Sequence, residues 1–198
     1  MKTNYQLETD QVLRGLTFRP RLLLHSCCGP CSSAVIEYLR PYFDLTVLYY
    51  NPNIQPETEY ARRLAAQKQL IERMCPEVAL LELGWDGPCY AEAVRGLENE
   101  PEGGARCTAC FALRLARTAR EAAAGNFDFF CTTLTVSPHK DAERINAIGR
   151  ALAEKYGVAW LPSDFKKREG YKRSIQLSRE YALYRQDYCG CLYAKPPT

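Results

Sequence analysis

Ten cysteines stand out in this 198-residue chain, and seven of them fall into three short clusters. The clusters are Cys27-Cys28-Gly-Pro-Cys31, Cys107-Thr-Ala-Cys110 and Cys189-Gly-Cys191. The N-terminal sequence has no apolar signal region and the chain has no run of about 18 apolar residues, so we expect a cytoplasmic protein without a membrane partner. Structural disulfides are not expected in that reducing compartment. The clustered thiols therefore predict metal binding or redox chemistry, whereas Cys75, Cys89 and Cys131 are typical of small buried hydrophobic residues.

The first cluster lies where a short apolar strand is expected to run into a helix. A helix N-terminus lowers the pKa of a thiol and activates it, so Cys28-Gly-Pro-Cys31 on its own favours a thioredoxin-like thiol–disulfide oxidoreductase. Cys27, however, adds a third adjacent thiol, and the other two clusters have no place in that interpretation.

The second cluster suggests a metal site shared with the first. Two thiols from each cluster would give four sulfur ligands, which suits either zinc or a cubane iron–sulfur cluster. The two clusters are about 80 residues apart, much further than the two halves of a zinc ribbon. This separation favours a site assembled between loops of a larger fold, and it mildly favours an iron–sulfur cluster. A zinc-stabilised RNA-binding protein is the alternative.

The third cluster has a spacing that is poor for joint chelation of one zinc. A disulfide between Cys189 and Cys191 would be strained, and strained disulfides are the labile, catalytic kind. The sequence therefore predicts a redox-active pair, with metal ligation as the alternative.

Asp86 follows an expected strand and could bind metal or move a proton, although a lone Asp in a turn is more often a cap. His25, at the end of an apolar strand, is expected to be a satisfied semi-buried residue rather than a ligand.

Strands and helices are expected to alternate, which predicts an α/β fold with a parallel sheet flanked by helices. Residues 1–20 form a polar N-terminal segment, 21–162 the α/β domain, and 163–198 a basic C-terminal segment, partly helical, packed on the same domain and unstructured at its end. The strands are expected at 21–25, 45–50, 78–83, 127–134 and 158–161, and the helices at 33–39, 57–74, 88–98, 107–124 and 139–156. Sites in such sheets lie at the carboxyl ends of the strands, which is where the first cysteine cluster begins.

The C-terminal segment concentrates positive charge. Residues 166–185 contain seven basic and two acidic side chains, a net charge of +5, whereas the whole chain carries +3. Tyrosines lie among these cations. Basic groups for phosphates and aromatic rings for bases are typical of an RNA-binding surface, although a solvated helix face would look the same.

Five motifs taken together resemble the cobalamin-independent epoxyqueuosine reductases of the QueH family. The resemblance extends from about residue 21 to residue 193, with Ala182 at a position where glycine is expected. The motifs are His25-Ser-Cys-Cys-Gly-Pro-Cys31, Glu102-Gly-Gly-Ala-Arg-Cys-Thr-Ala-Cys-Phe-Ala-Leu-Arg114, Thr132-Thr-Leu-Thr-Val-Ser-Pro-His-Lys140, Ser163-Asp-Phe-Lys-Lys167 and Tyr181-Ala-Leu-Tyr-Arg-Gln-Asp-Tyr-Cys-Gly-Cys191.

The resemblance implies a reaction and a cofactor. Epoxyqueuosine at the wobble position of tRNA would be reduced to queuosine, the final step of queuosine biosynthesis, by an enzyme with a nucleotide-hydrolase-like (HUP-like) fold and a [4Fe-4S] cluster. The partners implied are tRNAs with GUN anticodons and an unidentified electron donor. Cys31 and Asp86 are candidate ligands of the cluster or of an additional iron ion, and Asp86 or a tyrosine is the candidate proton donor. Carried over by motif, the cluster ligands are Cys27, Cys28, Cys107 and Cys110, and the redox-active pair is Cys189 and Cys191.

Overall fold

The structure, a computed structural model, describes residues 3–194, so the C-terminal end expected to be unstructured (195–198) lies outside it. Its centre is a five-stranded sheet with the order β3-β2-β1-β4-β5, in which every neighbouring pair is parallel. The predicted α/β class with a parallel sheet is thereby confirmed. The strands are β1 (Arg21–Ser26), β2 (Asp44–Tyr49), β3 (Ala79–Glu82), β4 (Phe129–Thr132) and β5 (Ala159–Trp160).

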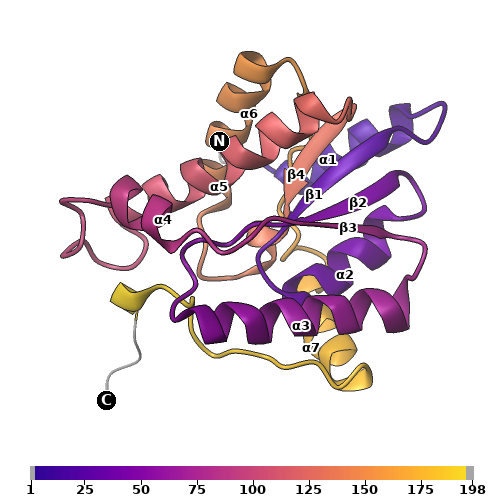
Figure 1. Cartoon of the computed structure of the whole chain (residues 1–198). Coiled ribbons are helices and arrows are strands. Elements are labelled where there is room, and N and C mark those ends of the chain that lie inside the picture. Colours follow the sequence, from indigo (N-terminus) through magenta and orange to yellow (C-terminus); the bar gives the residue numbers. More distant parts are fainter. Residues whose placement is uncertain (1–2, 195–198) are drawn as a thin grey trace.

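Helices cover both faces of the sheet because the chain winds outward twice in opposite directions. It passes from β1 to β2 and β3, and then returns to the other side of β1 to form β4 and β5. Right-handed crossovers therefore place α2 (Gly29–Leu39) and α3 (Glu57–Met74) on one face, and α5 (Ala105–Ala124) and α6 (Ala142–Tyr156) on the other (Figure 1). None of the helices in residues 3–194 has the length and apolarity that a bilayer crossing requires.

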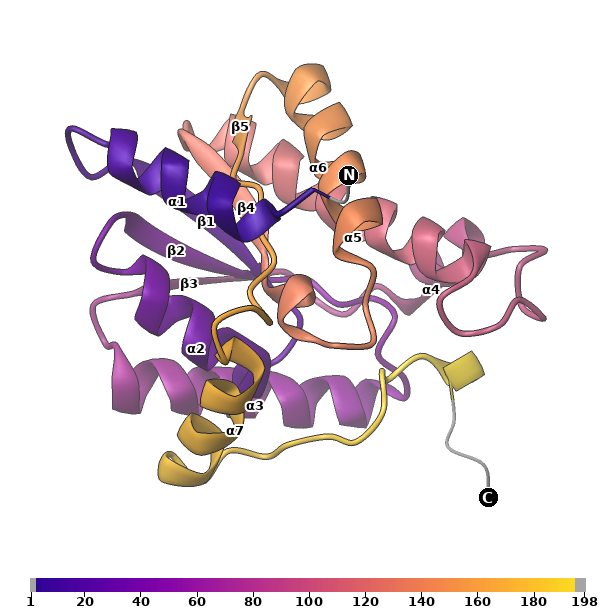
Figure 2. The ribbon, with the colours of Figure 1, turned by 180° about the vertical axis from the view of Figure 1, so that it is seen from behind.

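The remaining helices are short or peripheral. They are α1 (Tyr5–Gly15), α4 (Gly87–Ala93), α7 (Gly170–Glu180) and the 3₁₀ turns η1 (Thr133–Val136) and η2 (Leu192–Ala194). Helix α7 packs on α2, and Figure 2 shows it on the same side of the sheet as α2 and α3. Helix α1 was not foreseen in the polar N-terminal segment. It is fixed by hydrogen bonds from Gln6 to Tyr38 (3.1 Å) and from Thr9 to the carbonyl of Pro162 (2.6 Å).

Among the element boundaries that differ from the prediction, two flank the connection between β4 and α6. Helix α6 starts at Ala142 and not at residue 139, because Asp141 is its cap: the Asp141 carboxylate accepts hydrogen bonds from the backbone N–H groups of Glu143 and Arg144. The strand expected at 127–134 ends at Thr132, because the chain turns there into η1. Both differences lengthen the connection between β4 and α6, which borders the site described next.

Candidate metal and redox site

Three thiols meet at the carboxyl end of β1. The sulfur atoms of Cys27, Cys28 and Cys31 all lie within 4.8 Å of one another, and no other group of three His, Cys, Asp or Glu side chains in residues 3–194 is as close. Cys28 caps α2, where its Sγ accepts a hydrogen bond from the N–H of Cys31 at 3.3 Å. Strand β1 has β2 on one side and β4 on the other, so the cluster lies where the chain connections diverge, the usual position of a site in an open parallel sheet.

Polar side chains from other elements hold this cysteine loop. The hydroxyl of Thr133, directly after β4, accepts a hydrogen bond from the N–H of Cys27 (3.0 Å) and donates one to its Sγ (3.3 Å). On the other face, the side-chain carbonyl of Gln67 in α3 accepts from the hydroxyls of Ser26 (2.6 Å) and Ser32 (2.7 Å). The loop is thus fixed between β4 and α3 by hydrogen bonds of the protein itself.

The three thiols do not share charge equally. Hydrogen bonds from Cys28 and Cys31 lower the pKa of Cys27 well below its usual range, and the positive charges of Lys140 and Arg114 assist against the effect of burial. Burial raises the pKa of Cys28 to about 12, and its contact with Cys27 adds to the increase. The surroundings therefore favour the thiolate form more at Cys27 than at Cys28.

The second cysteine cluster lies in the first two turns of α5. Cys107 is half-buried, accepts a hydrogen bond from the N–H of Gly103 (3.2 Å) and packs against the main core, as Cys27, Cys28 and Cys31 do. Cys110 is buried, and burial raises its pKa to about 12. Neither sulfur belongs to the group within 4.8 Å, so a common site would draw ligands from both α2 and α5.

The third cluster reaches the site on a segment that follows α7 and runs back along α3 (Figures 1 and 2). The side-chain amide of Gln69 donates to the carbonyl of Tyr181 (2.9 Å) near the start of this segment, and Arg63 Nη1 donates to the carbonyl of Cys189 (3.1 Å) near its end. Gly190 has a φ of +93°, and a Cβ there would lie 2.8 Å from Arg63 Nη1. Glycine is therefore needed between the two cysteines.

The two cysteines of this third cluster have different surroundings. Cys191 is buried with Cys110, Tyr90 and Val94, and the Tyr90 hydroxyl lies 2.9 Å from Cys191 Sγ. Cys189 is half-buried and lines a cleft of about 860 Å³ together with Cys27 and Cys31. All ten cysteines, these two included, are free thiols in the structure. One member of the CxC pair thus faces the cleft while the other faces the interior.

Three cations that the sequence interpretation did not assign also line this cleft: Arg63, described above, Arg114 and Lys140. Arg114 is buried beside Cys110, with its Nη1 3.9 Å from Cys110 Sγ, and Lys140 is half-buried. Burial opposes the charge on Lys140, but Cys189, Cys27 and Cys31 raise its pKa. A signal for Arg114 was present, because a residue four positions after Cys110 lies on the same helix face. The sequence held no comparable signal for Lys140, whose place in the cleft depends on the connection after η1.

Asp86 and His25 have clear structural roles. The Asp86 carboxylate accepts from the N–H of Cys89 (3.3 Å) and caps α4, and Asp86 is not among the residues that line the cysteine cleft. His25 is fully buried. Its Nδ1 lies 2.8 Å from the Thr132 hydroxyl, and its Nε2 lies 3.1 Å from the carbonyl oxygen of Tyr50. Burial, together with the charge of Arg114, lowers the pKa of His25 to about 3. His25 is therefore neutral and hydrogen-bonded as expected, but it is fully buried and not semi-buried.

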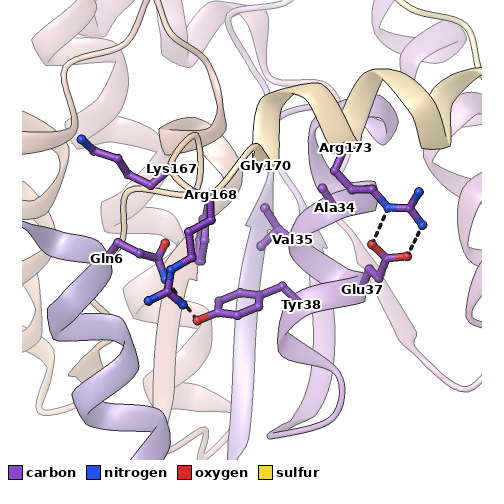
Figure 3. Close-up of a pocket in the computed structure, with 10 residues that line it drawn as sticks. Gln6, Ala34, Val35, Glu37, Tyr38, Lys167, Arg168, Gly170 and Arg173 are labelled. Atoms are coloured by element: carbon purple, nitrogen blue, oxygen red, sulfur yellow. Dashed lines mark hydrogen bonds and ion pairs between the residues drawn. The ribbon is translucent and has the colours of Figure 1, made fainter.

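Much of the charge in the basic segment is neutralised locally. A second cavity, of about 230 Å³ and without cysteines, lies between α1, α2 and the start of α7 (Figure 3). Beside it Arg173 makes two contacts with Glu37, at 2.7 and 2.8 Å, and Arg168 pairs with Asp10. Lys166 pairs with Asp164 and Lys172 with Glu169. Within the part of the chain that the structure covers, Lys167, Arg179 and Arg185 make no ion pair.

Comparisons with known proteins identify the family. The family model described as "Epoxyqueuosine reductase QueH" matches residues 22–196. A relative of that name from Streptococcus pyogenes is 42% identical over 98% of this chain and 80% of its own length. Relatives of the same name from Staphylococcus epidermidis (40% identical; 96% and 86% covered) and Thermotoga maritima (36% identical; 87% and 89% covered) agree. The chain therefore belongs to the epoxyqueuosine reductase QueH family and is an oxidoreductase.

Proposed function

We propose that this protein reduces epoxyqueuosine to queuosine at the wobble position of tRNA, using an iron–sulfur cluster held by its first two cysteine clusters. The observation that carries this proposal is the trio of thiols at the end of β1 in a member of this family, because two of them, Cys27 and Cys31, line the same cleft as Cys189. The reaction consumes two electrons and two protons, and the epoxide oxygen leaves as water while a double bond forms. The protein must therefore supply electrons, protons and a binding surface for RNA.

The donor set fits an iron–sulfur cluster. Thiolates are the usual ligands of iron–sulfur clusters, and Cys27, Cys28, Cys107 and Cys110 would provide four of them. Three buried guanidinium nitrogens have no hydrogen-bond acceptor in the described part of the chain, and two of them, Arg63 Nη2 and Arg114 Nε, belong to side chains that line the cysteine cleft. Buried donors without acceptors need an explanation, and sulfide or thiolate sulfur would accept from them. Cys31, beside Cys27 and Cys28, is the residue placed to hold an additional iron ion.

A cluster in this position would supply electrons and a Lewis acid for the epoxide oxygen. The chain's own residues prepare the site. Thr133 and Gln67 fix the loop that carries the ligands, and Lys140 places a positive charge beside Cys27, Cys31 and Cys189. A cation there favours the negative charge that develops on the oxygen as the C–O bond breaks.

The first prediction concerns ligand identity. In protein purified without oxygen, we expect about four iron and four sulfide per chain and a broad absorption shoulder near ~400 nm. Separate Cys27→Ala, Cys28→Ala, Cys107→Ala and Cys110→Ala variants should lose most of both, whereas Cys75→Ala and Cys131→Ala, at isolated cysteines, should keep them. Stoichiometric zinc without sulfide would instead support the zinc-stabilised RNA-binding alternative. Protein without any metal after reconstitution would support the thiol–disulfide alternative.

The CxC pair has the right stoichiometry to relay electrons. Oxidation of two thiols to a disulfide releases two electrons and two protons, the same numbers that the reduction of the epoxide consumes. Cys189 opens to the cleft and is fixed through its carbonyl by Arg63, while Cys191 contacts the Tyr90 hydroxyl. The positive φ of the intervening Gly190 gives the loop a tight bend between the two cysteines.

The second prediction tests this relay. Cys189→Ser and Cys191→Ser should each lose at least ~90% of turnover with a protein or dithiol reductant while retaining wild-type iron and sulfide contents. The measurement is the conversion of epoxyqueuosine to queuosine in tRNA, followed by nucleoside mass spectrometry. Cys89→Ser, at an isolated half-buried cysteine, serves as the matched control. Full turnover in both serine variants would rule out the relay.

Asp86 is the candidate proton donor among the acidic residues. It lies at the start of α4, the helix that also carries Tyr90 to Cys191. Its cap role and a catalytic role can be separated, because asparagine caps helices as well as aspartate does but cannot donate a carboxylic proton.

The third prediction therefore uses two substitutions at one position. Asp86→Asn should keep the unfolding free energy within ~0.5 kcal/mol of wild type, whereas Asp86→Ala should lose about 1 kcal/mol with the cap. If Asp86 donates the proton, both variants should lose ~10²-fold or more in kcat with their clusters intact. Wild-type kcat in Asp86→Asn would leave only the cap role.

Three cations of the basic segment are left free to contact RNA. Lys167 and Arg179 are exposed, and Arg185 lines the cysteine cleft with its guanidinium 5.5 Å from the ring centre of Tyr171. An arginine and an exposed aromatic ring at the mouth of a cleft suit a phosphate and an unstacked base, respectively. Arg173 and Lys166 are instead held by Glu37 and Asp164.

The fourth prediction is that Lys167→Ala and Arg185→Ala weaken binding of an epoxyqueuosine-containing anticodon stem-loop more than Arg173→Ala does. Each lost phosphate contact should reduce the slope of log K against log salt by about 0.7–0.9. Lys155→Ala is the control, because the last turn of α6 lies at the amino edge of the sheet, opposite the cleft. Unchanged binding and salt slopes in both test variants would place the RNA elsewhere.

A further inference from the structure

Arg114 carries a buried positive charge that the protein itself does not balance. Its side chain is only 2% exposed, and no carboxylate lies within ion-pair distance of it in residues 3–194. Its one strong partner is neutral: Nη2 donates to Asn51 Oδ1 at 2.5 Å, and Nε has no acceptor. An isolated buried charge is costly, so a compensating anion is expected nearby.

The other buried arginines show how this chain normally balances such a charge. Arg63 pairs with Glu59 at 2.6 Å. Arg106 donates to two backbone carbonyls, those of Glu98 and Glu100. Arg114 has neither a carboxylate nor a backbone carbonyl as a partner, and it lines the cysteine cleft, as Arg63 also does.

Cysteines of all three clusters contact Arg114 or line the same cleft. Cys110 Sγ is 3.9 Å from Nη1, and both Cys27 and Cys189 line the cleft with Arg114. In their thiolate forms, Cys110, Cys27 and Cys189 would raise the pKa of Arg114 against the effect of burial. The hydrogen bond to Asn51, which in turn donates to the carbonyl of Ser26 (2.9 Å), fixes the guanidinium beside the residue that precedes Cys27.

We infer that Arg114 is the counter-charge of the metal site, a positioning residue that compensates the negative charge of the thiolate-bound cluster and sets its reduction potential. This inference rests on the proposed function, since it needs the cluster. A four-thiolate iron–sulfur cluster is an anion that becomes more negative on reduction. A fixed cation beside it therefore stabilises the reduced form, and net charge and hydrogen bonds to sulfur are the established determinants of cluster potential.

The experiment compares Arg114→Gln, Arg114→Lys and Arg120→Gln with wild type, all purified without oxygen. Arg120→Gln is the matched control, because it removes the same charge from the same helix at a side chain that is 58% exposed. The readouts are iron and sulfide content, the midpoint potential from a spectroscopically monitored redox titration, and denaturant unfolding of the loaded protein and the apoprotein.

Arg114→Gln should shift the midpoint potential to more negative values by at least a tenfold change in the one-electron equilibrium constant, ~59 mV. Arg114→Lys should keep most of the wild-type potential, and Arg120→Gln all of it. Arg114→Gln should also cost more stability in the loaded protein than in the apoprotein. If Arg114→Gln cannot hold the cluster, retention by Arg114→Lys together with an undiminished apoprotein stability supports the same conclusion.

Three outcomes would overturn the inference. An unchanged potential in a cluster-loaded Arg114→Gln protein would show that the charge does not act on the cluster. The second is that Arg114→Gln and Arg114→Lys shift the midpoint potential equally, or lose the cluster equally, and also destabilise the apoprotein equally. This result would show that Arg114 has a packing role instead. Wild-type protein that holds no iron or sulfide would refute the proposed function and this inference with it, and the metal content distinguishes that failure from the first two.

Discussion

The divergence of the chain on either side of β1 is the constraint on which the site depends. The connection after β1 goes to one face of the sheet and the connection after β4 goes to the other, so the carboxyl ends of these two neighbours open into a cleft. Cys27 directly follows β1 and Thr133 directly follows β4. The Thr133 hydroxyl accepts a hydrogen bond from the Cys27 N–H and so joins the two strand ends. Without this pairing, the cysteine loop would carry a buried donor with no partner.

The positive charges of Arg114 and Lys140 act on all three cysteine clusters. The clusters come from different parts of the chain, on the loop before α2, on α5 and on the segment after α7. In the low-dielectric surroundings of the cleft such charge interactions are stronger than at a surface. The thiolates and the cations compensate each other's charge. Each would be costly to bury alone, and so would the guanidinium nitrogens that have no acceptor.

The C-terminal segment serves the fold as well as the proposed RNA contact. Arg173 and Arg168 tie α7 to α2 and α1 through Glu37 and Asp10, and the chain beyond α7 packs along α3 to deliver Cys189 and Cys191. Only the cations that make no such ion pair keep a full positive charge available to bind phosphate. A run of positive charge in a sequence therefore overstates the basic surface that a folded protein presents.

The sequence by itself determined the α/β class, the family and the three cysteine clusters, because strand–helix alternation and residue spacing are local properties that the chain keeps when it folds. The position of the first cluster at a strand end was also predictable. Only the tertiary structure decided which thiols meet: Cys31 joins Cys27 and Cys28, while Cys110 packs with Cys191, a residue more than 80 positions away. It also decided that Asp86 caps α4, that α1 packs on the domain, and that Arg114 is buried without an acidic partner. Burial and pairing depend on the packing of distant segments, and spacing along the chain holds no information about that packing.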